Sequence, residues 1–287
     1  MLSRGGAGSA QAFWPILQTI DSALRAGDRA TATRLSCEAL DAGHVHPVLL
    51  HLRAIRKKQN GLAESAFADI QRALQIAPQS PDLLAEAADS LNAAGEYQRA
   101  VVLADAALAI DPRHADAWHR KGYAHHMRTE LESAVAAFCQ AVRFDPRLAD
   151  AHARLANIAA GQGNLSDARS FAARALAIEP NNSIAVLACV AADLAEERLE
   201  EARRRLDTVL SDPAALPPIR AAATSQAGDV CDALGLTDEA FDAYRSAGEL
   251  WKSYYAPQVR KSGPDPIAVR YGPVVAALQA LHRGLSQ

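Results

Sequence analysis

Three side chains with the spacing of one helix face could bind a chemical group of a partner. His119, Tyr123 and His126 follow an i, i+4, i+7 pattern, which places them on one stripe of a helix. Arg154 and Asn157, from the next repeat defined below, join this set. Imidazole, phenol, guanidinium and amide groups together can hold a carboxylate or backbone amides. The alternative interpretation is a solvated helix face without a dedicated ligand.

Metal chemistry and catalysis are not indicated by the sequence. His119 and His126 lie ~10 Å apart along a helix, too far for one ion. The four cysteines form no C-x-x-C pair, and each stands at or beside an apolar helical position, so we expect reduced, buried thiols: Cys37, Cys139, Cys189 and Cys231. The common motifs for phosphate binding, hydrolysis and zinc catalysis do not occur. We therefore predict that the protein is not an enzyme and has no cofactor and no metal.

Composition favours an all-α fold. Across 287 residues, 30 Lys and Arg stand against 33 Asp and Glu, a formal charge of −3, which disfavours binding to nucleic acid. Hydrophobic residues make up 49% but aromatics only 5%, as expected for helices packed through small side chains and not for a sandwich or barrel. No apolar run is long enough for a membrane helix, and the first residues lack a signal-peptide pattern. We expect a cytoplasmic protein that does not contact a membrane.

Alanines recur with a step of 34 residues. The first ladder is Ala32, Ala66, Ala100, Ala134, Ala168 and Ala202. A second ladder follows it by seven residues: Ala39, Ala73, Ala107, Ala141, Ala175 and Val209. After a four-residue insertion the pair returns as Ala240 and Ala247. Self-similarity at this period predicts stacked repeats, each of which is one helical unit.

Turn residues give each repeat its shape. Glycine stands at position 15 of most units, where a first helix ends, and proline stands at position 32 of four units, where a second helix must stop. We predict seven helix-turn-helix units at 13–46, 47–80, 81–114, 115–148, 149–182, 183–216 and 221–254. Residues 1–12 are expected to be disordered. In 255–287, we expect a helix stop at Pro257, a linker, and a C-terminal capping helix that begins at Pro266 or Pro273 and ends near Arg283.

The segment ADAWHRKGYAHHMRTELESAVAAFCQAVRFDP resembles the tetratricopeptide repeat (TPR) family, whose pattern is W…L-G…Y…A…F…A…P. Lys121 and His125 replace the Leu and Tyr of that pattern, and Arg53 and Lys57 stand at usually apolar positions of the second unit. The resemblance implies a right-handed superhelix (α-solenoid). Its first helices would line a concave groove that holds a peptide or a partner's helix.

The family's groove positions select the candidate site. The polar candidates are Asp89, Asn92, His119, Tyr123, His126, Arg154 and Asn157, and the apolar candidates are Leu187 and Leu194. We interpret them as contacts for a partner with polar side chains and one apolar anchor. The alternative for the two leucines is packing on each other or on a neighbouring helix.

The sequence thus predicts a non-catalytic scaffold for a protein or peptide partner. A second interpretation rests on AFDAYRSAGELWKSYYAP, which is similar to the connector in bacterial chains where a TPR array precedes a sulfotransferase domain. In that case the chain would be the N-terminal TPR module of such a protein.

Overall fold

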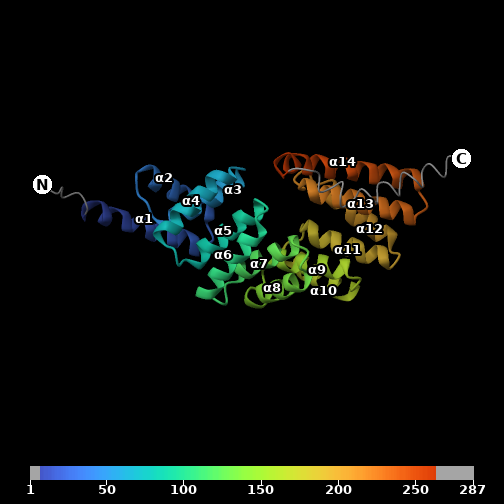
Figure 1. Ribbon diagram of the computed structural model, residues 1–287, viewed down its shortest axis with the longest axis horizontal. Helices are drawn as coiled ribbons and strands as arrows, with labels where there is room; N and C mark the ends of the chain where they lie inside the picture. Colours follow the sequence, from blue (N-terminus) through green and yellow to red (C-terminus); the bar gives the residue numbers. More distant parts are fainter. Residues whose placement is uncertain (1–6, 263–287) are drawn as a thin grey trace. The chain divides into compact units, whose positions relative to one another are not determined.

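The computed structural model describes residues 7–262, and the side chains of residues 14–256. The described part is helical, with short connections and no strand (Figure 1). Its first eight helices are α1 (Ala7–Arg25), α2 (Arg29–Asp41), α3 (Pro47–Gln59), α4 (Ala63–Ile76), α5 (Pro81–Ala93), α6 (Tyr97–Ile110), α7 (Ala115–Met127) and α8 (Leu131–Phe144). Six more follow: α9 (Ala149–Gly161), α10 (Leu165–Ile178), α11 (Ser183–Ala195), α12 (Leu199–Leu210), α13 (Pro217–Ala233) and α14 (Thr237–Ser262).

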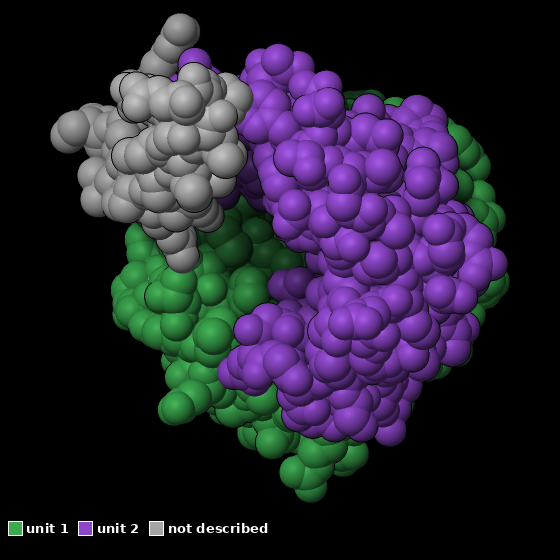
Figure 2. All heavy atoms as spheres, turned by 90° about the vertical axis from the view of Figure 1, so that its right-hand side faces the viewer, with its two compact units in different colours: residues 1–155 green, residues 156–287 purple. Residues whose placement is uncertain are grey.

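The chain divides into two compact units (Figure 2). The first unit comprises residues Met1–Leu155 and the second Ala156–Gln287, so the division falls inside α9. Within each unit, the consecutive helices from α1 to α8 and from α10 to α14 pack against each other in sequence order. The expected all-α architecture of helix-turn-helix repeats is confirmed.

Both alanine ladders are buried between packed helices. In the first unit Ala66, Ala100 and Ala134 are 0% exposed, and in the second unit Ala202 is 0% exposed. Small side chains at these positions let two helix backbones approach closely. The approach is close between α7 and α8, where a Cβ added to Gly122 would lie 2.8 Å from Cδ1 of the fully buried Phe138. The 34-residue period therefore encodes the helix packing.

The turn inside each repeat uses one backbone conformation. Five glycines have φ between 75° and 79° at this turn: Gly27, Gly61, Gly95, Gly163 and Gly235. Thr129 and Glu197 take the same place in the other two repeats, with φ of 62° and 56°. A positive φ disfavours residues with a Cβ, which explains the preference for glycine. The turn geometry persists even where the glycine is absent.

The charged residues of the second repeat have a partner inside the fold. Arg53 donates from Nε to Asp69 Oδ2 at 2.8 Å, and Lys57 Nζ lies 2.7 Å from the same oxygen. Asp69 is 5% exposed and stands on α4. The two cations of α3 thus replace apolar packing with ion pairs to a buried carboxylate.

Both ends of the helical region differ from the prediction. α1 begins at Ala7, inside the segment expected to be disordered, and it continues through Gly8 and Pro15. α14 ends at Ser262, past the predicted stop at Pro257. A proline removes one N–H donor and usually ends or bends a helix, but it leaves the hydrogen bonds of the neighbouring residues possible. The capping helix predicted within 266–283 lies outside the described residues.

The thiols are less buried than expected. Cys189 is buried, Cys37 and Cys231 are half-buried, and Cys139 is exposed. Cys139 follows the fully buried Phe138 by one residue and therefore faces another side of α8.

Candidate functional site

Polar side chains on the first helices of the first unit form a connected set, which we call the first-helix row. They come from α3, α5, α7 and the start of α9. The row consists of Lys58, Glu86, Asp89, Asn92, His119, Arg120, Tyr123, His126, Asp150 and Arg154. Its members connect adjacent first helices, so these helices lie side by side.

The α3–α5–α7 part of the row alternates in charge. Lys58 Nζ lies 2.6 Å from Glu86 Oε1 and also pairs with Asp89. Arg120 approaches the other oxygen of Asp89 at 2.9 Å. Burial would raise the pKa of Asp89, but the charges of Arg120 and Lys58 lower it below its usual value. Asn92 Nδ2 donates to the backbone carbonyl of Arg120 at 2.9 Å.

The α7–α9 part of the row centres on Asp150. His119 Nε2 lies 2.7 Å from Asp150 Oδ2, and Arg154 Nε donates to the same oxygen at 3.2 Å. Burial would raise the pKa of Asp150, but the hydrogen bond from His119 and the charge of Arg154 bring it well below its ordinary range. The Arg154 guanidinium carbon lies 4.7 Å from the centre of the Tyr123 ring. This cation–π contact joins α7 to α9.

The structure separates the predicted polar candidates by their accessibility. His119 and Asn92 are each 4% exposed, so they connect helices and cannot contact a partner directly. Tyr123, His126 and Arg154 are partly exposed. Burial and the charge of Arg154 lower the pKa of His126, which favours a neutral imidazole at pH 7.

Three buried polar atoms of the first-helix row remain without a hydrogen bond among the described residues. They are Asn92 Oδ1, His119 Nδ1 and His126 Nδ1. Such atoms are uncommon in folded proteins, and a ligand or water commonly satisfies them. Asn92 and His126 stand near the C-terminal ends of their helices, at position 12 of successive repeats.

The apolar anchor is not available as predicted. Leu187 is 6% exposed and belongs to a buried cluster of the second unit that includes Val190 and Leu206. Leu194 packs against the same cluster. The longer helix α13 lies beside α11 and covers the face of α11 where the apolar anchor was expected. Asn157, also in the second unit, is exposed.

Sequence reasoning missed Arg120 and Asp150, which pair with residues of adjacent helices. Asp150 precedes Arg154 by four residues, a spacing that brings opposite charges together on a helix and could have indicated the pair. Arg120 carried no comparable signal, because its partner Asp89 is one repeat away.

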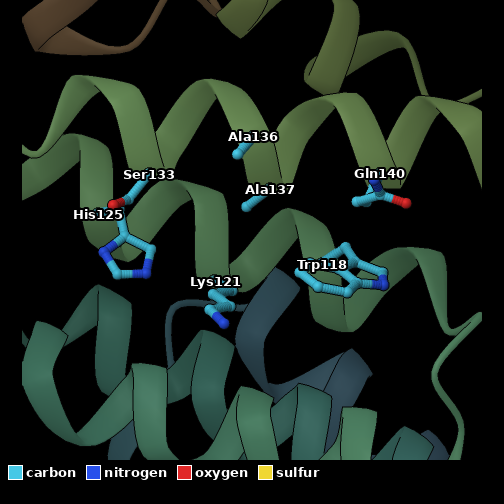
Figure 3. Close-up of a pocket in the computed structure, with 7 residues that line it drawn as sticks. All are labelled: Trp118, Lys121, His125, Ser133, Ala136, Ala137 and Gln140. Carbon is cyan, nitrogen blue, oxygen red and sulfur yellow. The ribbon is translucent and has the colours of Figure 1, made fainter.

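A hollow of about 630 Å³ lies between α7 and α8 in the first unit (Figure 3). Trp118, Lys121 and His125 line it from α7, and small side chains such as Ala136 and Ala137 line it from α8. Lys121 and His125 replace the Leu and Tyr of the family pattern. Lys121 Nζ lies 2.7 Å from Asp105, and His125 Nδ1 lies 2.6 Å from Glu130. These two polar side chains are therefore already paired within the chain.

A second ion cluster surrounds Asp193, which is 1% exposed. Arg169 and Arg198 donate to its Oδ1 at 2.8 and 3.0 Å, and Arg205 donates to its Oδ2 at 2.8 Å. These arginines come from α10, the α11–α12 turn and α12. The cluster ties three elements of the second unit together around one buried carboxylate.

Within residues 7–262 no group of three or more His, Cys, Asp or Glu side chains has an arrangement suited to a metal ion. None of the helices in that range combines the length and apolar character needed to cross a bilayer.

Comparison with known proteins identifies the repeat. Three tetratricopeptide repeat models match the chain, at residues 81–124, 130–183 and 159–224. These segments of the chain are tetratricopeptide repeats. No curated protein matches it in sequence.

Solved TPR structures share this fold. A thermophilic TPR protein of Thermus thermophilus is 21% identical with a TM-score of 0.53, over 63% of this chain and 98% of that one. A tetratricopeptide repeat protein from Parabacteroides merdae ATCC 43184 is 16% identical with a TM-score of 0.54, over 84% and 93%. The Cut9–Hcn1 structure of the APC/C is 14% identical with a TM-score of 0.65, over 82% of this chain and 46% of that one. At these identities the similarity establishes the fold alone.

Proposed function

We propose that this TPR protein is a non-catalytic scaffold that binds an extended peptide segment, or a helix of a partner, on its first-helix row. The observation that carries the proposal is the Arg154–Tyr123 contact at 4.7 Å. It presents a cation above an aromatic ring, both partly exposed, and the cation is held by Asp150, which also pairs with the buried His119. Preorganised Arg and Tyr side chains are typical of residues that dominate binding energy at protein interfaces.

The charges of the row indicate the kind of partner. The three cations Lys58, Arg120 and Arg154 are balanced by the carboxylates of Glu86, Asp89 and Asp150. A balanced row has no strong preference for a highly charged ligand. We therefore propose a partner that is recognised through its backbone amides and neutral polar side chains, with Asn157 as a further exposed contact on α9.

We also propose a cytoplasmic location. Support comes from the four cysteines, which are present as free thiols.

Selection of peptides from a display library, followed by calorimetric titration, tests the binding proposal. Replacing Arg154 or Tyr123 by Ala should weaken the selected peptide at least about tenfold, which corresponds to about 1.4 kcal/mol. Arg204→Ala is the matched control, because this arginine on α12 is 73% exposed and its ion pair lies within one helix turn. Unchanged affinity in folded Arg154→Ala and Tyr123→Ala variants would refute the proposal.

A further inference from the structure

Charged side chains recur at equivalent positions of the second and sixth repeats. In the second repeat, Arg53 and Lys57 stand at positions 7 and 11, and Asp69 stands at position 23. Asp69 Oδ2 accepts from Arg53 Nε at 2.8 Å and lies 2.7 Å from Lys57 Nζ. In the sixth repeat the signs are reversed, because Asp193 at position 11 accepts from Arg205 Nε at position 23, at 2.8 Å. The side chain at position 23 thus balances the charge on the first helix of its own repeat.

The fourth repeat has basic side chains at positions 7 and 11 but no charge at position 23. Lys121 and His125 occupy the first two positions, and Ala137 occupies the third. The side chains at position 23 in the other five of the first six repeats are larger: Leu35, Asp69, Leu103, Phe171 and Arg205. Ala137 is 2% exposed and lines the hollow between α7 and α8 together with Lys121 and His125 (Figure 3). The hollow therefore corresponds to the place that Asp69 fills in the second repeat.

The carboxylates that Lys121 and His125 have as partners are accessible to water. Asp105, on α6, lies 2.7 Å from Lys121 Nζ, and its side chain is 51% exposed. Glu130 lies 2.6 Å from His125 Nδ1, and Arg128 balances its charge from 2.8 Å. Ion pairs that are open to water contribute little free energy, and a lysine has three N–H donors. A further carboxylate can therefore share Lys121 with Asp105.

The wall of the hollow is mainly apolar, with Trp118 on the side of α7 and Ala136 on the side of α8. The Trp118 indole is fixed, because its Nε1 donates to the backbone carbonyl of Pro112 at 2.9 Å and Lys121 Nζ lies 5.3 Å from its ring centre. The volume of about 630 Å³ is in the range of small-molecule sites. In the fifth repeat, the chain itself places an aromatic ring at position 23, that of Phe171. An aromatic body therefore suits this place in the repeat.

We propose that the hollow between α7 and α8 binds a small aromatic carboxylate. Its carboxylate takes the place that the Asp69 carboxylate has in the second repeat and pairs with Lys121, and its ring packs on Trp118 and Ala136. The residues of α7 that line the hollow lie on a different side of this helix from Tyr123. The site is therefore distinct from the peptide contacts proposed for the first-helix row.

Titration of the full chain with phenylacetate, followed by NMR, tests the proposal. Phenylacetate should shift the Trp118 indole N–H signal and the Ala136 amide signal in a saturable manner, with a Kd on the order of 1 mM for a ligand of this size. The neutral phenylacetamide is the matched control ligand. It should bind at least about tenfold more weakly, because it lacks the charge that Lys121 recognises.

Two variants test the residues of the site. Ala137→Asp supplies the carboxylate of the second repeat within the chain and should abolish phenylacetate binding. Lys121→Gln leaves position 137 unchanged and should weaken binding at least about tenfold, so it decides the outcome if Ala137→Asp does not fold. Lys252→Gln, at an exposed lysine of α14, is the matched control variant and should bind phenylacetate as the native protein does.

The absence of a saturable shift with phenylacetate would overturn the proposal. Equal binding of phenylacetamide would do the same, as would unchanged binding by folded Ala137→Asp or by Lys121→Gln. Tighter binding of N-acetylglutamate α-amide than of phenylacetate would also overturn it, because that result would indicate an acidic side chain of a partner as the occupant.

Discussion

Replacement of Gly122 by Ala tests the close packing of α7 on α8. Alanine favours a helix interior over glycine by about 1 kcal/mol, so helix propensity alone predicts stabilisation. The added Cβ would lie 2.8 Å from Cδ1 and 2.9 Å from Cε1 of Phe138. The Phe138 ring is 0% exposed, and His119 packs against it with ring centres 5.6 Å apart, so the ring has no free space to move into.

The steric cost should exceed the propensity gain. Overpacking of a filled core costs roughly 1–3 kcal/mol, so we expect Gly122→Ala to be neutral or to lower the free energy of unfolding by up to about 2 kcal/mol. Urea unfolding followed by circular dichroism measures this change. Gly161→Ala, at the end of α9, is the matched control, because its added Cβ meets no atom within 4 Å. This control should be neutral or slightly stabilising.

A double-mutant cycle separates the two effects. When Phe138 is first replaced by Leu, the ring carbons that face Gly122 are removed, so adding Ala at position 122 should become stabilising. The coupling between the two sites should exceed about 1 kcal/mol. If Gly122→Ala stabilises the protein equally in both backgrounds, the helices do not pack as described and the reasoning is wrong.

Three further predictions concern ion pairs and the alanine ladder. His114 Nε2 lies 2.9 Å from Asp82 Oδ1, and this hydrogen bond raises the pKa of His114 above 6.5. The contribution of the pair to stability should be complete below pH 6.5 and lost as the pH rises through the raised pKa. An NMR titration in which Asp82→Asn leaves the pKa of His114 unchanged would contradict the pairing. Asp193→Asn should lower the free energy of unfolding by about 2–4 kcal/mol, which is less than the loss of a fully buried ion pair would cost, because the arginines around Asp193 stay partly hydrated. Asp242→Asn, at an exposed ion pair, should change the free energy of unfolding by under about 0.5 kcal/mol. Equal effects of the two substitutions in urea unfolding would refute this prediction. Ala134→Leu should cost roughly 1–3 kcal/mol in the same assay, and an unchanged unfolding midpoint would contradict the burial of the ladder.

The fold could be predicted because its determinants repeat at fixed spacing. Ala66 and Ala100 occupy equivalent places in successive repeats, and both are 0% exposed. Turn positions were also predictable, since the left-handed backbone favours glycine there. The end of α14 was not, because Pro257 is a local breaker signal that the structure does not follow.

The candidate site was only partly predictable, because repeat positions give the direction of a side chain and not its partner. His119 was expected in the groove, yet Asp150 from the next first helix pairs with it, and it is 4% exposed. Leu187 was expected to be open, but α13 begins at Pro217, before the predicted unit 221–254, and packs beside α11. Such contacts depend on residues one repeat or more away, which a one-dimensional pattern does not specify.

The central claim is that partners bind on the first-helix row. Site-specific photocrosslinking with a selected peptide tests this claim most directly. A photoreactive phenylalanine analogue at position 123 on α7 should crosslink to the peptide. The same group in place of Val102, which is 59% exposed on the second helix α6, should not. Crosslinking at position 102 with none at position 123 would contradict the account.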